Sequence, residues 1–353
     1  MRIHLGHHFY GAGNLGDDFM LAGFLSAMRD LEPATSFTAA VPFPLEPLRT
    51  RFPEIDWRPY DPTIRAECIR SCDAWLGLGG SPFQSAQSRW FIDHLVHDAE
   101  LCRQHRKPMF FLGVGVQNEA ELAVAEVRQL VGQAKAVWTR DDASATRLSR
   151  FAGDMRISAA ADLAHVFFRS TPLPAARPGR VTVVANMDFN EWPGQDAFVT
   201  GVEMTRPREH VWLVQETREL LGAERDLHAR MPEAIRSRWT LTSPDIPGAP
   251  LQTVTSHWPS GEWLVTARFH AALAGAWSGS KVVVIATNEK LRAAAAELDC
   301  PSLPIDATSD QVARALAKAR PLKPPVSSAD LAMAACREWV QRVKLGVRAE
   351  RPA

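Results

Sequence analysis

Arg268 and His270 are the two side chains whose types and spacing indicate chemistry most directly. They lie in the stretch Thr266-Ala267-Arg268-Phe269-His270-Ala271-Ala272-Leu273-Ala274-Gly275. A guanidinium can hold a carboxylate or a phosphate through two parallel N–H bonds, and an imidazole beside it can take up or release a proton near neutral pH. The residues alone leave a second interpretation open, in which the arginine caps helix carbonyls and the histidine is a half-buried structural group.

The stretch lies at the junction of a predicted strand and a predicted helix. The apolar run Trp263-Leu264-Val265 precedes it, small residues typical of a helix follow, and Val282-Val283-Val284-Ile285 is the next predicted strand. Open α/β sheets bind ligands where a parallel strand hands over to a helix. The position therefore favours the chemical interpretation.

Strand and helix patterns alternate along most of the chain, as in doubly wound α/β proteins. The first half predicts strands over 2–8, 37–41, 73–78, 108–116 and 135–139, and helices up to about residue 30 and over 45–52, 86–106, 119–133 and 142–151. The second half predicts strands over 181–186, 210–214, 238–242, 262–266 and 282–286, and helices over 216–231, 268–278, 288–298, 308–319 and 328–347.

These patterns predict two Rossmann-like domains, over 1–170 and 181–325, that face each other across a cleft as in the GT-B architecture. Residues 171–180 contain three prolines and predict a stiff linker. Residues 326–353 predict a C-terminal helix and tail after the second domain. A length of 353 residues also favours two domains over one.

The composition excludes several classes of protein. Forty basic residues balance forty acidic ones, so there is no electrostatic footprint for nucleic acid. Five cysteines without paired spacing predict free thiols, and no metal site is expected. The chain opens directly on a strand pattern and contains no apolar run of membrane-spanning length, so we expect a cytoplasmic protein.

A glycine-rich loop, Gly11-Ala12-Gly13-Asn14-Leu15-Gly16-Asp17-Asp18, joins the first strand to the first helix. Its spacing matches the dinucleotide fingerprint G-x-G-x-x-G. The second strand ends without the acid that would bind a ribose hydroxyl, and two aspartates stand where a pyrophosphate would lie, so a nicotinamide cofactor is disfavoured. The loop instead presents Asn14 and Asp17 as polar groups, unless Asp17 only caps the helix.

Seven short motifs, taken in order, resemble those of the polysaccharide pyruvyl transferase family over about residues 4–300. The first is the glycine-rich loop, and the R-x-H pair Arg268 and His270 belongs to a later one. The full set is Gly11-x-Gly13-Asn14-x-Gly16-Asp17-Asp18, Leu78-Gly79-Gly80-Ser81, Gly113-Val114-Gly115, Trp138-Thr139-Arg140-Asp141 with Ser144, Ala161-Asp162-Leu163, Thr266-Ala267-Arg268-Phe269-His270 and Thr287-Asn288-Glu289-Lys290.

The resemblance implies an enzyme that moves the pyruvyl group of phosphoenolpyruvate onto a sugar of a surface polysaccharide or its precursor, closing a ketal with loss of phosphate. Arg268 and Lys290 would bind the donor in the second domain, His270 would be the general acid, and Asp17 the base. Phosphoenolpyruvate is a donor substrate, and no cofactor is implied. The acceptor side would be the first domain, and the remaining substrate residues would be Gly13, Asn14, Gly16, Gly80, Ser81 and Arg140.

The chain departs from the family pattern at three places. Asp18 replaces the usual glutamate, Ala185-Asn186-Met187 stands where an arginine or serine is usual, and Gln215-Glu216 stands where a histidine is common. The last two lie on the expected donor side. Two alternatives therefore stay open: a GT-B glycosyltransferase that uses a nucleotide sugar, and a non-catalytic saccharide-binding relative.

Basic residues on the last predicted helix raise one question of location. They predict either peripheral contact with the inner membrane face, where a lipid-linked acceptor would lie, or a solvated helix face packed on the first domain. These residues are Arg337, Arg342, Lys344 and Arg348.

Overall fold

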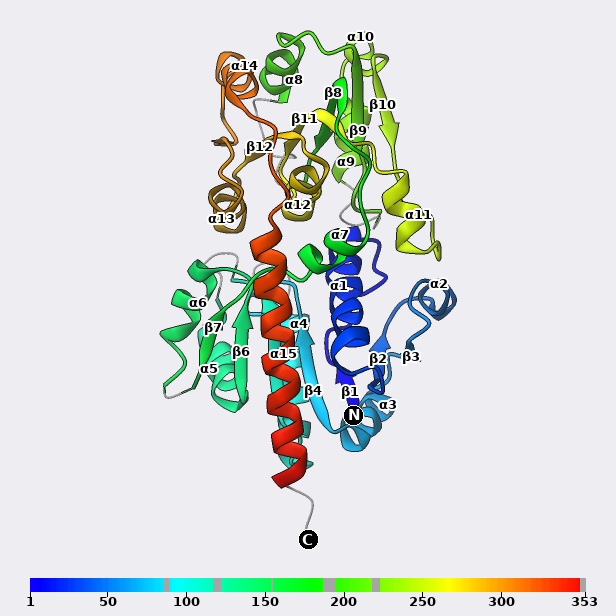
Figure 1. The fold of residues 1–353 in the computed structure, drawn as a ribbon, viewed down its shortest axis with the longest axis vertical. Helices are drawn as coiled ribbons and strands as arrows, with labels where there is room; N and C mark the ends of the chain where they lie inside the picture. Colours follow the sequence, from blue (N-terminus) through cyan, green and yellow to red (C-terminus); the bar gives the residue numbers. More distant parts are fainter. Residues whose placement is uncertain (86–88, 117–121, 154, 187–194, 218–222, 350–353) are drawn as a thin grey trace. The chain divides into compact units, whose positions relative to one another are not determined.

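The computed structural model describes residues 1–85, 89–116, 122–153, 155–186, 195–217 and 223–349 (Figure 1). The chain forms two compact units. The first comprises Met1–Gly11, Asp17–Phe167 and Val326–Ala353, and the second comprises Ala12–Gly16 and Phe168–Pro325. Each unit is an α/β domain built on one parallel sheet, as the alternating patterns predict.

The sheet of the first unit has seven strands in the order β3-β2-β1-β4-β5-β6-β7 among the described residues. All neighbouring strands in this sheet are parallel. Parallel neighbours cannot be joined by a tight hairpin, so helical connections alternate with the strands. Its elements are β1 (Arg2–Leu5), α1 (Leu15–Leu31), β2 (Ser36–Val41), α2 (Leu45–Arg51), β3 (Ile55–Pro59), α3 (Pro62–Ser71), β4 (Ala74–Leu78), α4 (Trp90–Gln104), β5 (Met109–Val114), α5 (Val124–Gln133), β6 (Ala136–Thr139), α6 (Asp142–Ser149), β7 (Ile157–Ala159) and α7 (Ala164–Ser170).

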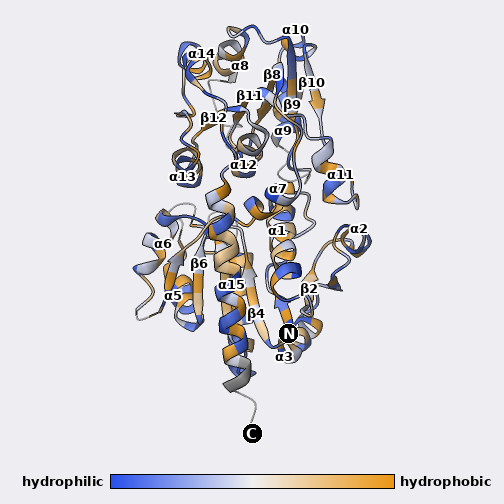
Figure 2. Ribbon diagram, viewed as in Figure 1, coloured by the Kyte–Doolittle hydropathy of each residue, from blue (hydrophilic) through white to orange (hydrophobic). Residues whose placement is uncertain are grey.

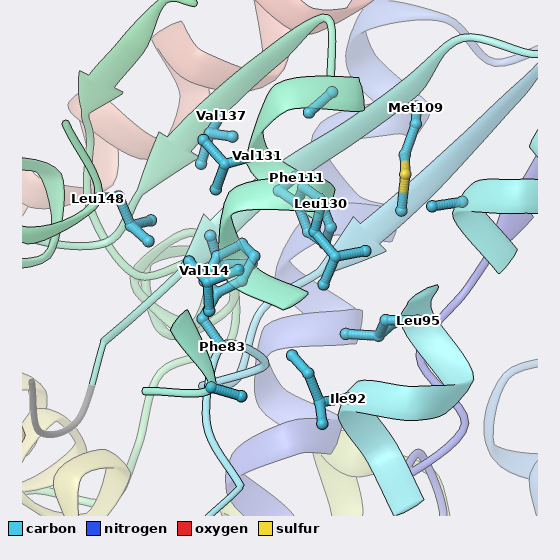
Figure 3. Close-up of a cluster of buried hydrophobic side chains, with 14 of the residues drawn as sticks. Phe83, Ile92, Leu95, Met109, Phe111, Val114, Leu130, Val131, Val137 and Leu148 are labelled. Atoms are coloured by element: carbon cyan, nitrogen blue, oxygen red, sulfur yellow. The ribbon is translucent and has the colours of Figure 1, made fainter. Parts of the chain in front are cut away.

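The central strands β4 and β5 of this sheet are buried over their whole length and read as continuous hydrophobic runs, as expected where both faces of a parallel sheet are covered. Figure 2 colours much of this sheet as hydrophobic. On one face, Phe111 and Val137 pack with Ile92 and Leu95 of α4 and Leu130 of α5 (Figure 3). Successive residues of a strand point to opposite faces. The neighbouring residues Phe110 and Trp138 accordingly contact each other outside this cluster.

The last helix, α15 (Val326–Ala349), packs on the first unit. Trp339 is fully buried and its ring lies 5.5 Å from the ring of Phe24 in α1. Glu338 accepts a hydrogen bond of 3.0 Å from the indole of Trp138. Of the four basic residues noted above, Lys344 pairs with Glu32 and Arg342 with Glu338. Two cations of the proposed membrane-facing set are therefore engaged within the first unit.

The second unit has a six-stranded parallel sheet in the order β10-β9-β8-β11-β12-β13 among the described residues. The buried parts of its central strands β8, β11 and β12 are mostly apolar, with Thr182 and Thr266 as buried polar residues. Its elements are β8 (Arg177–Val184), α8 (Gln195–Glu203), β9 (Glu209–Leu213), α9 (Ala223–Arg230), α10 (Glu233–Arg236), β10 (Trp239–Thr242), α11 (Leu251–Ser256), β11 (Gly261–Thr266), α12 (Phe269–Ser278), β12 (Lys281–Ile285), α13 (Glu289–Glu297), β13 (Ser302–Leu303) and α14 (Ser309–Lys318).

The predicted linker over 171–180 is too long, because β8 already begins at Arg177. The backbone N–H of Arg177 donates to the carbonyl of Ser260, and Arg177 lies opposite Gly261 of β11. The register shifts between Gly261 and Trp263, and such an irregularity is where a strand tolerates a proline such as Pro178. Proline content alone therefore marks too wide a linker.

The described residues also show the state of the cysteines and the length and polarity of the helices. All five cysteines are free thiols, and Cys300 is half-buried while the other four are buried, as the lack of paired spacing predicts. None of the helices in the described ranges is both long and apolar enough to cross a bilayer.

Candidate functional site

In the second unit the strand order reverses between β8 and β11, and open α/β sheets bind ligands at such a switch point. Ala185 and Asn186 follow β8, and Ala267 and Arg268 follow β11. The side-chain amide of Asn186 donates to the carbonyl of Ala267 at 2.9 Å, which ties the two strand ends together. The predicted R-x-H motif therefore lies at the ligand-binding edge of its sheet. Met187, the third residue of that departure from the family pattern, lies outside the described residues.

Arg268 is the N-cap of α12 and its side chain is held by two buried carboxylates. Nη1 donates to Glu216 at 2.5 Å, and Nε donates to Glu224 at 2.9 Å and to the carbonyl of Ala185 at 3.1 Å. The side chains of Glu216 and Glu224 are 2% and 0% exposed. The guanidinium thus stands at the predicted place, but two protein carboxylates already accept hydrogen bonds from its Nε and Nη1.

Burial changes the charge balance around Arg268. It raises the pKa of Glu224 to about 7, and the positive charge of Arg268 offsets only part of that rise. Glu224 is therefore partly protonated near neutral pH. The negative charge beside the guanidinium then depends on pH in the physiological range.

His270, two residues further on, is 4% exposed and packs against the glycine-rich loop. A Cβ atom added to Gly16 would lie 2.0 Å from Nδ1 of the imidazole. Gly16 also donates its backbone N–H to the side-chain oxygen of Asn14 at 3.0 Å. The last glycine of G-x-G-x-x-G is thus required by the close approach of an imidazole, and no dinucleotide is needed to explain it.

Backbone pairing holds the loop in the second unit. Asn14 forms an antiparallel bridge with Glu216, and the N–H of Thr217 donates to the carbonyl of Gly13 at 2.7 Å. The N–H of Leu15 donates to the carbonyl of Gln215. Glu216 therefore has two contacts: its backbone pairs with the loop, and its carboxylate pairs with Arg268. For this reason Ala12–Gly16 groups with the second unit, although sequence order predicts it in the first domain.

Lys290 lies in the first turn of α13, and its ammonium is 5.2 Å from the ring centre of Phe269. Phe269 stands between Arg268 and His270 in the motif, and its ring meets the imidazole edge-on at 5.2 Å. The structure therefore brings Lys290, which follows β12, to Phe269, the residue between Arg268 and His270 in the turn after β11. Asn288 caps α13 by accepting from the N–H of Leu291, which fixes where α13 begins.

The other predicted residues lie in the first unit, around the ends of β4, β5 and β6. Gly80 has a φ of +73°, and its carbonyl accepts from the N–H of Gly115. Arg140 donates to the hydroxyl of Ser81 at 3.1 Å, and a Cβ atom on Gly115 would clash with its guanidinium. The side chain of Arg140 is 0% exposed. These contacts assign Arg140 a part in holding the two glycine turns together.

The two aspartates that follow Gly16 have different surroundings in the first unit. Asp18 is buried and forms an ion pair of 2.6 Å with Arg51. Asp17 is half-buried, and its charge adds to the burial that raises the pKa of Tyr10 well above its usual value. Asp18 is thus engaged in a buried ion pair, and the role of Asp17 in proton transfer stays a prediction of the sequence.

The sequence analysis did not assign roles to Glu216 and Glu224. Glu216 had one signal, since Gln215-Glu216 departs from the family pattern. Glu224 had none, because it reaches Arg268 from the start of α9, 44 residues away in the chain. Among the residues that the structure describes, no group of three or more histidine, cysteine, aspartate or glutamate side chains is arranged to hold a metal ion.

The fold and the site define a two-domain α/β enzyme scaffold of the GT-B type. Residues 14–207, more than half of the chain, match the family model of polysaccharide pyruvyl transferase. This protein belongs to the polysaccharide pyruvyl transferase family, whose members are transferases that act on polysaccharides. The comparison with curated proteins finds no match.

Solved structures of low identity share the fold over nearly the full chain. MnaA of S. aureus, solved with UDP, is 13% identical with a TM-score of 0.64, and the match covers 100% of this chain and 98% of that one. The UDP-N-acetylglucosamine 2-epimerase of Rickettsia bellii is 10% identical with a TM-score of 0.63, covering 99% and 96%. Anabaena HepE, solved with UDP, is 10% identical with a TM-score of 0.51, covering 99% and 97%. At these identities the likeness shows the fold alone.

Proposed function

We propose that this protein transfers the pyruvyl group of phosphoenolpyruvate onto two hydroxyls of a sugar in a surface polysaccharide or its precursor. The observation that supports the proposal best is that Arg268 and His270 follow β11 at the switch point of the second unit and that the ammonium of Lys290 lies against Phe269, the residue between them in the chain. A donor with a carboxylate and a phosphate needs cations, and its enol carbon needs a proton donor. The three side chains supply both.

In the proposed reaction His270 gives a proton to the methylene carbon of the enol, and the adjacent carbon becomes oxocarbenium-like. The first sugar hydroxyl adds to that carbon, and the C–O bond to phosphate breaks. The second hydroxyl then closes the ketal. Of the two hydroxyl protons, one replaces the proton that His270 donated to the methylene carbon, and the other leaves with phosphate. Asp17, the residue after Gly16 in the chain, would accept a hydroxyl proton.

The two carboxylates on Arg268 add a condition for donor binding. With Glu216 and Glu224 both ionised, the two carboxylates outweigh the single positive charge of Arg268, so the group repels a polyanionic donor that a free guanidinium would attract. Protonation of Glu224, whose pKa is about 7, removes one negative charge and weakens its hold on Nε. We propose that the donor binds with Glu224 protonated and takes over part of the guanidinium.

A second function has its own support. The same two carboxylates reduce the positive charge available to a small donor, and MnaA and HepE, which share the fold, were solved with UDP. A nucleotide sugar carries fewer negative charges than phosphoenolpyruvate and makes more contacts with its protein. A GT-B glycosyltransferase is therefore the alternative. In that case UDP, and not phosphoenolpyruvate, would stabilise the protein against heat.

The test is a thermal-shift titration with phosphoenolpyruvate, UDP and UDP-glucose on the wild type, Arg268→Ala and Arg292→Ala. A ligand that binds only the folded state raises the melting temperature according to its occupancy. Arg292 is the control, because it lies on α13 of the same unit and its exposed side chain contacts Glu289 and the carbonyl of Ala286. We expect phosphoenolpyruvate to stabilise the wild type and Arg292→Ala and to lose its effect in Arg268→Ala.

A response to UDP or UDP-glucose without a response to phosphoenolpyruvate would overturn the proposal in favour of the glycosyltransferase. A product assay completes the test. Phosphate released from phosphoenolpyruvate only in the presence of a saccharide, together with a saccharide product heavier by a pyruvyl ketal in mass spectrometry, is the expected result.

A further inference from the structure

A second cluster of aromatic and polar side chains lies at the switch point of the first unit, where the strand order reverses between β1 and β4. His8 follows β1, Tyr60 follows β3, and Trp90 begins α4, the helix after β4. The imidazole of His8 is 4.1 Å from the ring of Trp90 and 5.5 Å from that of Tyr60, meeting both edge-on. We call His8, Tyr60 and Trp90 the aromatic cluster.

A buried polar network fixes the aromatic cluster from below. Arg65 and Asp98 form an ion pair of 2.9 Å with side chains 7% and 0% exposed. Arg65 also donates to the hydroxyl of Tyr60 at 2.8 Å and contacts Nδ1 of His94 at 2.7 Å. The ring of His94 lies 4.3 Å from that of His8. Arg65 thus holds Tyr60 of the aromatic cluster and His94 beside His8 in place.

The aromatic cluster combines an exposed ring with a buried polar atom that lacks a partner. Trp90 is 51% exposed, although it is among the largest apolar side chains of the chain. His8 is 2% exposed, and within the described ranges no hydrogen bond reaches its Nδ1. Burial lowers the pKa of His8 to about 3, so the imidazole is neutral and can donate or accept at one nitrogen. Buried polar atoms normally have partners, so a lone one at a ligand-binding edge indicates a missing partner.

We propose that the aromatic cluster binds a neutral pyranoside ring of the acceptor saccharide. An exposed indole offers an apolar face for the C–H face of a sugar, and the neutral imidazole offers a hydrogen bond to a hydroxyl. An anionic ligand is disfavoured because Arg65, a cation that contacts Tyr60, is buried and already paired with Asp98. The inference rests on the proposed function for the identity of the saccharide as acceptor, but the binding of a pyranoside here can be measured without the donor.

The experiment measures binding and turnover separately on the full chain. Saturation-transfer difference NMR, without phosphoenolpyruvate, detects binding of methyl galactopyranoside, methyl glucopyranoside and methyl mannopyranoside to the wild type, Trp90→Ala, Trp90→Phe and His8→Asn. Leu331→Ala is the control, because Leu331 is 54% exposed in α15 of the same unit. Phosphate release from phosphoenolpyruvate then gives KM for the same glycosides. Melting temperatures confirm that each variant is folded.

We expect Trp90→Ala and His8→Asn to weaken glycoside binding, Trp90→Phe to retain most of it, and Leu331→Ala to match the wild type. In turnover, Trp90→Ala raises KM for the glycoside about tenfold with little change in kcat, because it removes binding that the ground state and the transition state share. KM for phosphoenolpyruvate stays the same.

The two proposals fail in different ways. Glycoside binding that depends on Trp90, without any use of phosphoenolpyruvate, would overturn the proposed function and leave the pyranoside site standing. Pyruvyl transfer with an unchanged glycoside KM in both Trp90→Ala and His8→Asn would overturn the site and leave the function standing. A wild type that binds none of the three glycosides would overturn the site as well.

Discussion

At the scale of residues, the contact between Gly16 and His270 links the two most distinctive motifs of the chain. A Cβ atom on Gly16 would lie 2.0 Å from Nδ1 of the imidazole, far inside van der Waals distance. Gly16 is the second residue of α1, where alanine is otherwise the better helix former. Any harm done by Gly16→Ala therefore comes from the displaced imidazole and not from helix propensity.

We predict that Gly16→Ala lowers the rate of pyruvyl transfer by about 10²-fold, because displacing a catalytic group by about 1 Å has effects of that size. The measurement is kcat with phosphoenolpyruvate and a saccharide acceptor. Gly132→Ala is the control, since nothing lies within 4 Å of a Cβ added there. An unchanged rate in Gly16→Ala would show that His270 is not the group that moves the proton.

The raised pKa of Glu224 leads us to predict that the stability of the folded chain depends on pH. Burial raises its pKa in the folded chain to about 7, above its ordinary value, so the folded state binds more protons than the unfolded state between those two pKa values. Stability from this group is therefore greatest below its ordinary pKa and is lost as the pH rises to about 7. Relative to the wild type, we expect Glu224→Gln to gain melting temperature between about pH 5 and about pH 8.

Glu209→Gln is the control for that series, because Glu209 lies in the same unit and its pKa is lowered by its hydrogen bond to Arg180. Its difference from the wild type should stay constant over the same interval, because a carboxyl with a lowered pKa is ionised there in both the folded and the unfolded chain. If Glu224→Gln followed Glu209→Gln, the carboxyl of Glu224 would be ionised throughout, and the proposed role of its protonation in donor binding would be wrong.

At the scale of elements, α15 is a structural part of the first unit. Trp339 is fully buried against Phe24, and Glu338 of the same helix binds the indole of Trp138. Trp339→Ala should lower the free energy of unfolding by about 3–5 kcal/mol, the usual cost of emptying a buried aromatic site. Chemical denaturation measures it. Leu345→Ala on the same helix, at a residue that is 66% exposed, should cost far less.

A small effect of Trp339→Ala, equal to that of Leu345→Ala, would mean that α15 adds little to the core of the first unit. The helix would then be available for other contacts, including the peripheral membrane contact that its basic residues suggest. Lys344 and Arg342 argue against that role, because each is already paired with a glutamate of the first unit.

At the scale of the whole molecule, the chain begins and ends in the first unit and builds the second from its middle. Each unit has its own parallel sheet and its own buried apolar side chains. Local openings in proteins follow such cooperative units. We therefore predict that Trp339→Ala speeds amide hydrogen exchange in β1, β4 and β5 and leaves β8, β11 and β12 unchanged.

Hydrogen exchange followed by mass spectrometry checks this prediction. Equal acceleration in both sheets would mean that the two units open together. The amide of Thr217 is a further marker, because it donates to the carbonyl of Gly13. Its exchange rate reports on Ala12–Gly16, the N-terminal loop that belongs to the second unit.

Much of the architecture could be predicted from local sequence patterns. Hydrophobic runs and helical periodicity identify β4, β5, β11, β12 and most long helices, because burial on both faces of a parallel sheet leaves a clear pattern. The short elements β3, β7 and β13 did not appear among the predicted strands. Two to five residues carry too little periodicity to stand out, and such strands form because a sheet edge is available to pair with.

The sequence by itself determined the fold class, the family motifs and the place of Arg268 and His270 at a strand-to-helix turn. Only the tertiary structure decided what those side chains touch. The carboxylates on Arg268 come from Glu216 and Glu224, and the residue beneath His270 is Gly16, more than 250 positions earlier in the chain. Local patterns report which face of an element is buried, whereas pairing between distant turns depends on the order in which strands assemble into a sheet.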